Sequence, residues 1–174
     1  MSAAEIRQYV TFVLMGEEYG VEIPRVREII EYEPITRIPS MPAPVRGVMN
    51  LRGSVVPVVD LALKFGQPET PAGRETYIVV FDLVWNDESV RLGLMTTVLG
   101  RVIDAGDDLI KPVPDFGTRI RADYLRGIMQ TEGQGQFVLL LNVDRLLSPA
   151  ELLGTLSARD EAAAAVAEPA SQGG

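Results

Sequence analysis

Two aspartates offer the clearest opportunity for acid–base chemistry in this chain. Asp60 precedes the apolar stretch LALKF, and Asp144 precedes RLL. A pair of carboxylates held at different pKa values can act as a general acid and a general base. An aspartate just before an apolar stretch is also typical of a helix N-cap. We favour the capping role for both residues, and a carboxylate hydrolase is the weaker alternative.

The residue types that carry most other catalytic and metal chemistry are absent. The chain has no His and no Cys, which excludes a Ser-His-Asp triad, a thiolate nucleophile and zinc sites with sulfur or imidazole ligands. Ser40 and Ser54 lack a Lys placed to activate them, and no Gly-rich phosphate motif is present. The acidic residues Asp104, Asp107 and Asp108 lack the spacing of an EF-hand. We therefore predict no catalysis, no metal and no cofactor.

An arginine-glycine step between two apolar runs predicts an exposed binding corner. The segment from Gly47 to Leu61 reads GVMNLRGSVVPVVDL. Gly53 can take the positive φ of a tight turn, which leaves Arg52 displayed between apolar neighbours. Arginine is favoured at interfaces because its planar guanidinium binds carboxylates and its stem packs on apolar surface. The other interpretation of this segment is a solvated turn arginine.

A second charged segment follows Pro24. Val26, Ile29 and Ile30 have the spacing of one helical face, and Pro24 suits a first helical turn. The charged residues on the outer face of this predicted helix are Arg25, Arg27, Glu28, Glu31 and Glu33. We favour a solvated face with an Arg27–Glu31 pair, and the alternative is the rim of an interface around Val26.

Composition and charge limit the partners. The chain has 174 residues, 47% of them hydrophobic, and a formal net charge of −8. This is enough apolar material for the core of one domain or two small lobes. The acid excess argues against binding to nucleic acid or to an anionic membrane. No apolar run is long enough for a signal peptide or a membrane span, so we expect a soluble, cytoplasmic protein without direct membrane insertion.

Short apolar runs separated by turn residues predict an all-β fold with few short helices. The runs are Tyr9–Met15, Tyr19–Ile23, Val45–Asn50, Ser54–Val59, Tyr77–Trp85, Val90–Met95, Val98–Asp104, Leu125–Thr131 and Phe137–Asn142. Their number and even spacing favour closed or nearly closed barrels over βαβ units.

The clearest helix is expected at the C-terminal end. Ser148-Pro149-Ala150-Glu151 has the residues of a capping box, with Pro at the first helical position. Leu152, Leu153 and Leu156 would dock this helix on the body. From residue 158 the composition becomes Ala-rich and then reaches Pro and Gly, which predicts a flexible tail over 158–174.

The order of the strand runs repeats along the chain. Tyr9–Leu14 resembles Tyr77–Leu83, Val45–Asn50 resembles Leu125–Gln130, and the Val-Asp step at Asp60 resembles that at Asp144. Three matches in one order favour two related β-lobes, roughly 9–66 and 67–148, with strand exchange between them allowed. We expect the lobes to share a hydrophobic seam, because neither buries enough surface alone. The alternative is a chance similarity of short apolar strings.

Several of these segments together resemble the CheW family, the coupling proteins of bacterial chemotaxis. The segments are FVLMGEEYGVEIPRVREI, ITRIP, GVMNLRGSVVPVVDLALKFG and LLLNVDRLL, and the resemblance covers residues 8–156. It implies a CheW-like domain over 8–157, built of two five-stranded SH3-like barrels, with no catalysis. It also implies a cytoplasmic scaffold, recruited to membrane receptor arrays, that binds the cytoplasmic tip of chemoreceptors and the regulatory domain of the histidine kinase CheA. Rings that include further copies of the protein are a further partner expectation.

The resemblance assigns partner binding to particular positions. Arg52 matches the arginine of the N-L-R-G block, and the V-x-E block and the basic-Gly pair add four more residues. The full set implied for receptor and kinase contacts is Val26, Glu28, Arg46, Gly47 and Arg52, with Val98 and Leu99 as weaker candidates in a groove between the lobes.

One departure from the family pattern leaves alternatives open. Thr97 and Arg101 stand where many members carry acidic residues, which changes the local charge and leaves open a coupler for a different receptor class or for an accessory, non-flagellar array. A barrel that binds oligosaccharides or oligonucleotides is another alternative, and it would need exposed aromatic residues among basic ones. Only 6% of residues are aromatic, and we place Tyr9, Phe12, Tyr77 and Phe81 in strand cores.

Overall fold

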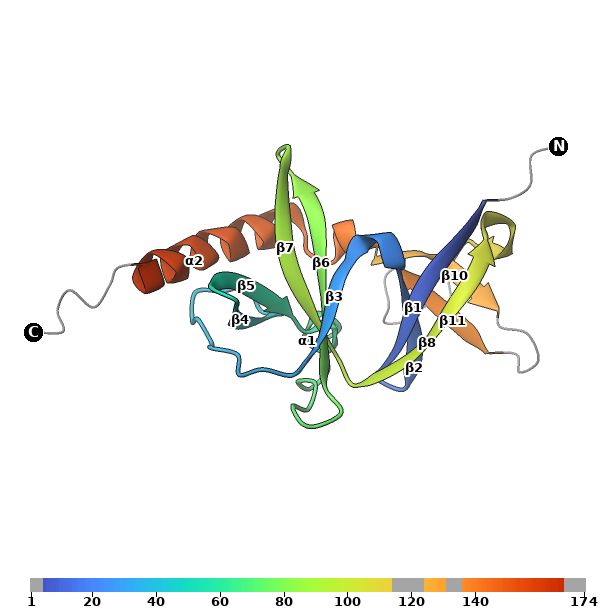
Figure 1. Ribbon diagram of the computed structural model, residues 1–174, viewed down its shortest axis with the longest axis horizontal. Coiled ribbons are helices and arrows are strands. Elements are labelled where there is room, and N and C mark those ends of the chain that lie inside the picture. Colours follow the sequence, from blue (N-terminus) through green and yellow to red (C-terminus); the bar gives the residue numbers. More distant parts are fainter. Residues whose placement is uncertain (1–4, 114–123, 131–135, 168–174) are drawn as a thin grey trace, which may run out of the picture.

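Two curled β-sheets make up the body of the protein, with one long helix at an end (Figure 1). The computed structural model describes residues 5–113, 124–130 and 136–167. The strands are β1 (Ile6–Leu14), β2 (Glu17–Glu22), β3 (Val26–Glu31), β4 (Val45–Leu51), β5 (Ser54–Val59), β6 (Tyr77–Trp85), β7 (Glu88–Thr96), β8 (Val98–Gly106), β9 (Ile110–Lys111), β10 (Leu125–Gln130) and β11 (Phe137–Leu141). The helices are α1 (Leu61–Lys64) and α2 (Pro149–Ala167), and the 3-10 turns are η1 (Ile23–Arg25), η2 (Asp107–Leu109) and η4 (Val143–Arg145).

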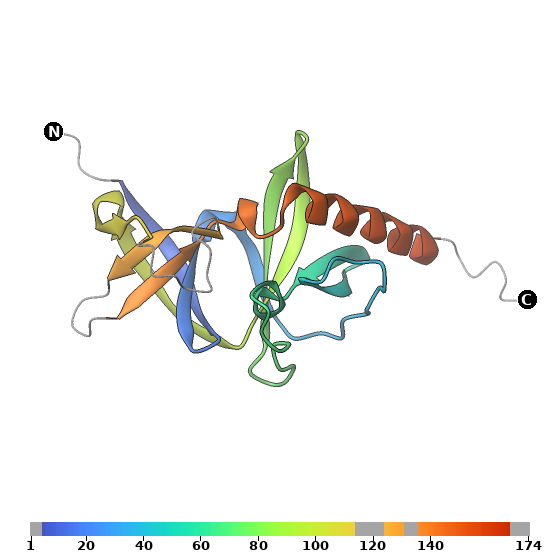
Figure 2. The ribbon, with the colours of Figure 1, turned by 180° about the vertical axis from the view of Figure 1, so that it is seen from behind.

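Each sheet forms one lobe, and neither lobe is a continuous half of the chain. Lobe 1 has the strand order β8-β1-β2-β11-β10-β9, and lobe 2 has the order β3-β6-β7-β5-β4. The chain leaves lobe 1 after β2, builds the whole of lobe 2, and returns to lobe 1 at β8 (Figures 1 and 2). The sheets therefore do not coincide with the expected stretches 9–66 and 67–148, because the N-terminal hairpin pairs with the C-terminal one, a strand exchange that the sequence prediction allowed.

The two lobes follow the same plan despite this exchange. In lobe 1 the hairpin β1–β2 meets the hairpin β10–β11 through a parallel pairing of β2 with β11. In lobe 2 the hairpin β6–β7 meets β4–β5 through a parallel pairing of β7 with β5. Each sheet also takes one strand that comes directly after the hairpin of the other lobe. β8 follows the β6–β7 hairpin of lobe 2 but pairs with β1 of lobe 1, and β3 follows the β1–β2 hairpin of lobe 1 but pairs with β6 of lobe 2. The matched sequence segments thus occupy equivalent strands.

The largest hydrophobic cluster lies between the lobes. It contains Phe12 and Tyr19 of lobe 1 together with Phe81 and Leu92 of lobe 2, each fully buried. Smaller clusters fill the interior of each lobe, around Met49 in lobe 2 and around Tyr9, Met129 and Val138 in lobe 1. The predicted shared seam is confirmed, and burial at this seam removes more apolar side chains from water than either lobe interior does.

The predicted capping box at the start of α2 is confirmed. The Ser148 Oγ accepts a hydrogen bond from the Glu151 N–H at 3.1 Å, and Glu151 Oε1 accepts one from the Ser148 N–H at 2.9 Å. Leu152 is buried, but Leu153 is 59% exposed and does not dock the helix. The helix also continues to Ala167, where the sequence predicted a flexible tail from residue 158. Ala158 is buried, and the Ala-rich segment after it has the high helix propensity that lets α2 continue. Residues 168–174 of the predicted tail lie outside the described residues.

The sequence predicted a helix after Pro24, and this prediction is wrong. The turn η1 ends at Arg25, and Val26–Glu31 instead forms β3, which pairs with β6. The β-branched side chains in this segment fit a pleated strand, and β6 supplies the backbone partners. Residues four apart in a strand are about 13 Å apart, so the expected Arg27–Glu31 pair is replaced by an Arg27 ion pair with Asp82 of β6 at 2.7 Å.

Candidate partner-binding site

The turn between β4 and β5 presents Arg52 to solvent. Leu51 and Ser54 face each other across the hairpin, so Arg52 and Gly53 are its two loop residues. Both have positive φ, +49° and +87°, as the favoured two-residue hairpin turns require. Asn50 Oδ1 accepts a hydrogen bond from the Gly53 N–H at 2.9 Å and fixes the turn. The Arg52 side chain is 68% exposed, which agrees with the corner predicted from the sequence.

Glu28 of β3 fixes the position of this arginine. Arg52 Nη1 lies 3.2 Å from Glu28 Oε2, and Nη2 bonds the other carboxylate oxygen, so the pair is bidentate. The hydrogen bond from Arg52 lowers the pKa of Glu28, and the positive charges of Arg91 and Arg27 lower it further. Because β3 and β4 are the two edge strands of lobe 2, this ion pair connects its two edges. The sequence indicated both residues but not their pairing.

Val26 faces the seam and is not a fully exposed residue. Its side chain is half-buried against the central cluster, and its backbone pairs with Phe81 of β6. Beside it, Arg25 forms a bidentate ion pair with Asp144 and donates to the Asp82 carbonyl at 3.0 Å. Through Arg25, the crossover η1 thus contacts both η4, which follows the last strand of lobe 1, and β6 of lobe 2.

Arg46 and Gly47 make their contacts inside lobe 2. The Arg46 side chain is 12% exposed, and its Nη1 lies 3.1 Å from Asp60 Oδ2 and 2.9 Å from the Thr70 carbonyl oxygen. Gly47 is buried at a β-bulge with φ +153°, and a Cβ there would lie 2.2 Å from the Thr36 carbonyl oxygen. The basic-Gly pair therefore has a structural role, because it positions β4 and the segment that crosses it.

Val98 and Leu99 lie where the chain passes from lobe 2 back to lobe 1. They begin β8 directly after β7 ends at Thr96, and they pair with Val13 and Phe12 of β1. Val98 is 43% exposed, whereas Leu99 is half-buried. These positions agree with an apolar surface at the junction of the lobes.

The two residues that depart from the family pattern make specific contacts near this junction. Thr97 Oγ1 donates a hydrogen bond of 2.6 Å to the Val13 carbonyl oxygen, which a carboxylate could not donate. Arg101 pairs with Glu18 of β2, with Nε 3.3 Å from Oε2. The acidic charge expected at Arg101 is therefore replaced by a cation that neutralises a neighbouring carboxylate.

The two candidate catalytic aspartates have separate structural partners. Asp60 is fully buried and caps α1 by accepting from the Ala62 N–H at 3.1 Å, as predicted. Asp144 lies inside η4, where Asn142 is the capping residue, so its predicted capping role is wrong. Its carboxylate instead pairs with Arg25, and that hydrogen bond lowers the pKa of Asp144. In the part of the chain that the structure describes, no group of three or more acidic residues could hold a metal ion.

Comparison with known proteins identifies the relatives of this chain. The CheW-like domain family matches residues 8–151. Chemotaxis protein CheW of Klebsiella aerogenes is 32% identical over 146 residues, which is 84% of each chain, and that of Treponema pallidum is 33% identical over 147 residues, 83% of this chain and 84% of the other. The crystal structure of the scaffolding protein CheW of Thermoanaerobacter tengcongensis superposes with a TM-score of 0.73 at 26% identity, covering 87% of this chain and 92% of that one. The predicted class of two small SH3-like lobes is thereby confirmed.

Proposed function

The chain belongs to the CheW family, and from that premise we propose that it is a non-enzymatic adaptor that couples chemoreceptors to a CheA-type histidine kinase. Its relatives are named as chemotaxis and scaffolding proteins. In this proposal the protein holds larger partners in position and carries out no reaction. The two candidate carboxylates support this view, because each forms an ion pair with a different arginine. Asp60 pairs with Arg46, and Asp144 pairs with Arg25.

The observation that carries the proposal is the Arg52 corner. A hairpin turn with two residues at positive φ presents Arg52 at the surface with its side chain 68% exposed, and the bidentate pair with Glu28 fixes the orientation of its guanidinium. An arginine held in this way loses little side-chain entropy on binding, so a contact with a partner is less costly than it is for a freely rotating side chain. We propose that Arg52 and Glu28 together form a kinase or receptor contact.

A second contact is proposed at the junction of the lobes. Val98 is exposed there, and the apolar seam lies directly beneath the strands that meet at this point. An amphipathic receptor helix could bury an apolar stripe against this surface, which is the usual helix-in-groove mode of recognition. A single contact of this kind is weak. Several linked contacts in an array would keep the protein bound for longer through avidity.

The proposed location is the cytoplasm, at membrane receptor arrays. None of the helices in the described part of the chain combines the length and apolar character needed to cross a membrane. Recruitment would therefore depend on the protein partners. Rings that contain further copies of the protein are part of the same proposal.

Co-sedimentation with receptor-containing membranes and kinase tests the adaptor role. We expect wild type to pellet with both partners and Arg52→Ala to lose most of this binding while keeping its circular dichroism spectrum and urea midpoint. The matched control is Arg37→Ala, because Arg37 is also an exposed arginine of lobe 2 with one carboxylate partner, Glu69. Equal binding by wild type and Arg52→Ala would contradict the site, and no pelleting of wild type would contradict the adaptor role.

One alternative is favoured by a specific observation. The Arg101–Glu18 pair and the Thr97 hydrogen bond replace the acidic surface expected beside Val98. A coupler that serves a different receptor class or an accessory array would have such a changed surface. The same co-sedimentation with two receptor classes separates the alternatives. The oligosaccharide- or oligonucleotide-binding alternative has less support, because Tyr9, Phe12 and Phe81 are buried and offer no stacking surface.

A further inference from the structure

At one end of lobe 2 the apolar interior gives way to charged side chains, Asp82 of β6 and Arg91 of β7, and we call this end the charged mouth. Along β6, Ile78 and Val80 belong to the interior cluster, and the next residue on that face is Asp82. Along β7, Met95 is in the same cluster, and Arg91 lies opposite Asp82 in the strand register. The face that is apolar inside the lobe therefore becomes polar where it emerges.

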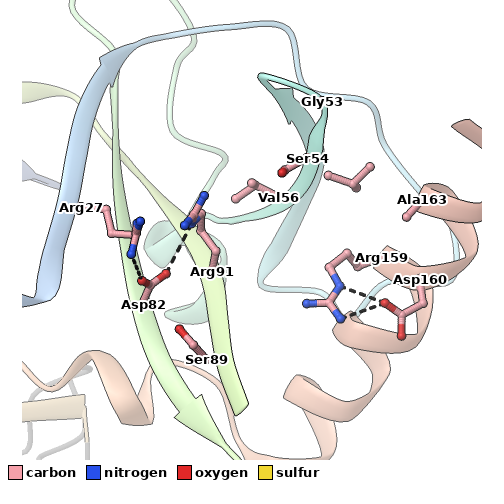
Figure 3. Close-up of a pocket in the computed structure, with 11 residues that line it drawn as sticks. Arg27, Gly53, Ser54, Val56, Asp82, Ser89, Arg91, Arg159, Asp160 and Ala163 are labelled. Atoms are coloured by element: carbon pink, nitrogen blue, oxygen red, sulfur yellow. Dashed lines mark hydrogen bonds and ion pairs between the residues drawn. The ribbon is translucent and has the colours of Figure 1, made fainter. Parts of the chain in front are cut away.

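A hollow of about 600 Å³ lies at this mouth, between the strands and α2 (Figure 3). Arg27, Asp82 and Arg91 are on its strand side, and Ser54 and Ser89 contribute hydroxyl groups. Arg159, Asp160 and Ala163 of α2 form the opposite wall. Arg52 is not among the lining residues, so the hollow is distinct from the proposed partner corner, although Gly53 beside it belongs to the rim.

Guanidinium groups outnumber carboxylates in this hollow. Asp82 is shared, with Oδ2 2.7 Å from Arg27 Nη1 and Oδ1 3.4 Å from Arg91 Nε. Arg159 donates twice to one oxygen of its neighbour Asp160, at 3.0 and 2.8 Å, and that aspartate is 68% exposed. Among the lining residues three arginines thus face two carboxylates, and the nearby Glu28 is already paired with Arg52. This leaves a local positive charge on a chain whose net charge is −8.

Packing and ion pairs restrain the side chains on both walls of the hollow. Thr155 and Ala158 of α2 are buried, so the turn that carries Arg159 is packed against the body. On the strand side, the shared Asp82 restrains both Arg27 and Arg91. Figure 3 shows Arg159 across the hollow from Arg91. Guanidinium groups fixed on opposite walls suit a planar anion between them, because each fork can bind a carboxylate through two N–H groups.

We infer that this hollow binds an aspartate or glutamate side chain of an acidic peptide segment, with the carboxylate between Arg159 and the Arg27–Arg91 pair. A singly charged carboxylate fits better than a phosphate dianion, because Asp82 and Asp160 would repel the second charge. A long polyanion is disfavoured by the net charge of the whole chain. This site does not depend on receptor or kinase binding and extends the protein's contacts beyond the Arg52 corner.

Fluorescence anisotropy with the full chain tests this inference. The probe is a short labelled peptide of alternating Glu and Ala, and the matched peptide has Gln in place of Glu. We expect the Glu peptide to bind, the Gln peptide not to bind, and higher salt to weaken binding. Arg159→Gln or Arg91→Gln should each weaken binding about tenfold, as expected for loss of one charge-assisted contact.

The control variant is Arg101→Gln, which removes an equal charge from lobe 1, far from the hollow in the fold. It should leave binding unchanged. Equal weakening by Arg101→Gln and Arg159→Gln would overturn the inference, because binding would then follow net charge alone. Binding of the Gln peptide, absence of Glu-peptide binding at low salt, or full displacement by millimolar inorganic phosphate would each overturn it as well. Co-sedimentation of wild type with receptor and kinase is unaffected by these outcomes.

Discussion

The same arginine and aspartate positions behave differently in the two lobes. In lobe 2, Arg46 of β4 and Asp60 after β5 pair with each other at 3.1 Å, and Asp60 is fully buried. In lobe 1, the equivalent Arg126 pairs with Glu22, and Asp144 pairs with Arg25 at its half-exposed surface. A repeated motif therefore fixes the position of a side chain along a strand but not its partner.

The loop after α1 causes this difference. Thr70 donates to Asp60 through its N–H at 2.8 Å and through its hydroxyl at 2.6 Å, and its carbonyl accepts from Arg46. These bonds cover the ion pair of lobe 2 and exclude water from it. Asp144 instead faces Arg25 of η1, the crossover between β2 of lobe 1 and β3 of lobe 2. Burial makes the first pair part of the core, whereas the second is a contact between lobes.

The largest effect should come from breaking the buried pair. Asp60→Ala leaves Arg46 without its buried partner and removes the α1 cap, and we expect it to lower the free energy of unfolding by about 3–5 kcal/mol. Asp144→Ala should lower it by at most about 1 kcal/mol, because its ion pair is half-exposed. Urea unfolding of both variants measures the difference. Equal losses would show that the two pairs are equivalent after all.

The second largest difference is expected between the glycines of the two Arg-Gly steps, Gly47 in lobe 2 and Gly127 in lobe 1. Gly47→Ala places a Cβ against the Thr36 carbonyl at a φ of +153°, and we expect a loss of about 2–4 kcal/mol in the free energy of unfolding. In Gly127→Ala the Cβ would lie 2.5 Å from Ile110 Cγ2 and 2.8 Å from the Lys111 carbonyl oxygen, so the backbone contact is less close than at Gly47, and Gly127 is not among the positive-φ glycines. We expect the smaller loss there, about 1–2 kcal/mol. Thermal unfolding followed by circular dichroism would measure both, and the reverse order would contradict the assignment of strain to lobe 2.

The smallest effect is a pH dependence of the contact between lobes. The hydrogen bond from Arg25 lowers the pKa of Asp144 in the folded state. A carboxyl with a lowered folded pKa adds stability above its unfolded pKa of about 4, and this stability is lost as pH falls through the folded value. Asp144→Asn should thus be slightly less stable than wild type at neutral pH, and the difference should vanish in acid. Urea midpoints measured from neutral to acidic pH would test this, and a constant difference would be inconsistent with an Asp144 contribution.

Much of the local structure was predictable because its cause is local. The N-L-R-G turn follows from the positive φ that Gly53 allows, and the capping box at Ser148 follows from two residues three positions apart. The charged mouth of lobe 2 was not predicted. Its signal was present in β6 and β7, where Asp82 and Arg91 interrupt the apolar alternation, but Arg159 was placed in a tail. The helix error at Val26 had the opposite cause, since a helical spacing was overridden by pairing with β6.

Local sequence patterns were enough to establish the β class, the repeated strand segments, the exposed Arg52 and the need for a shared apolar seam, because alternation, turn chemistry and apolar content act over a few residues. Three features emerged only from the folded chain: the N-terminal hairpin joins the C-terminal one, Glu28 holds Arg52, and α2 brings Arg159 to the mouth of lobe 2. These outcomes depend on which distant segments share a ladder or an ion pair. Such pairing is settled by the burial and charge of the whole fold, and no short stretch of sequence contains that information.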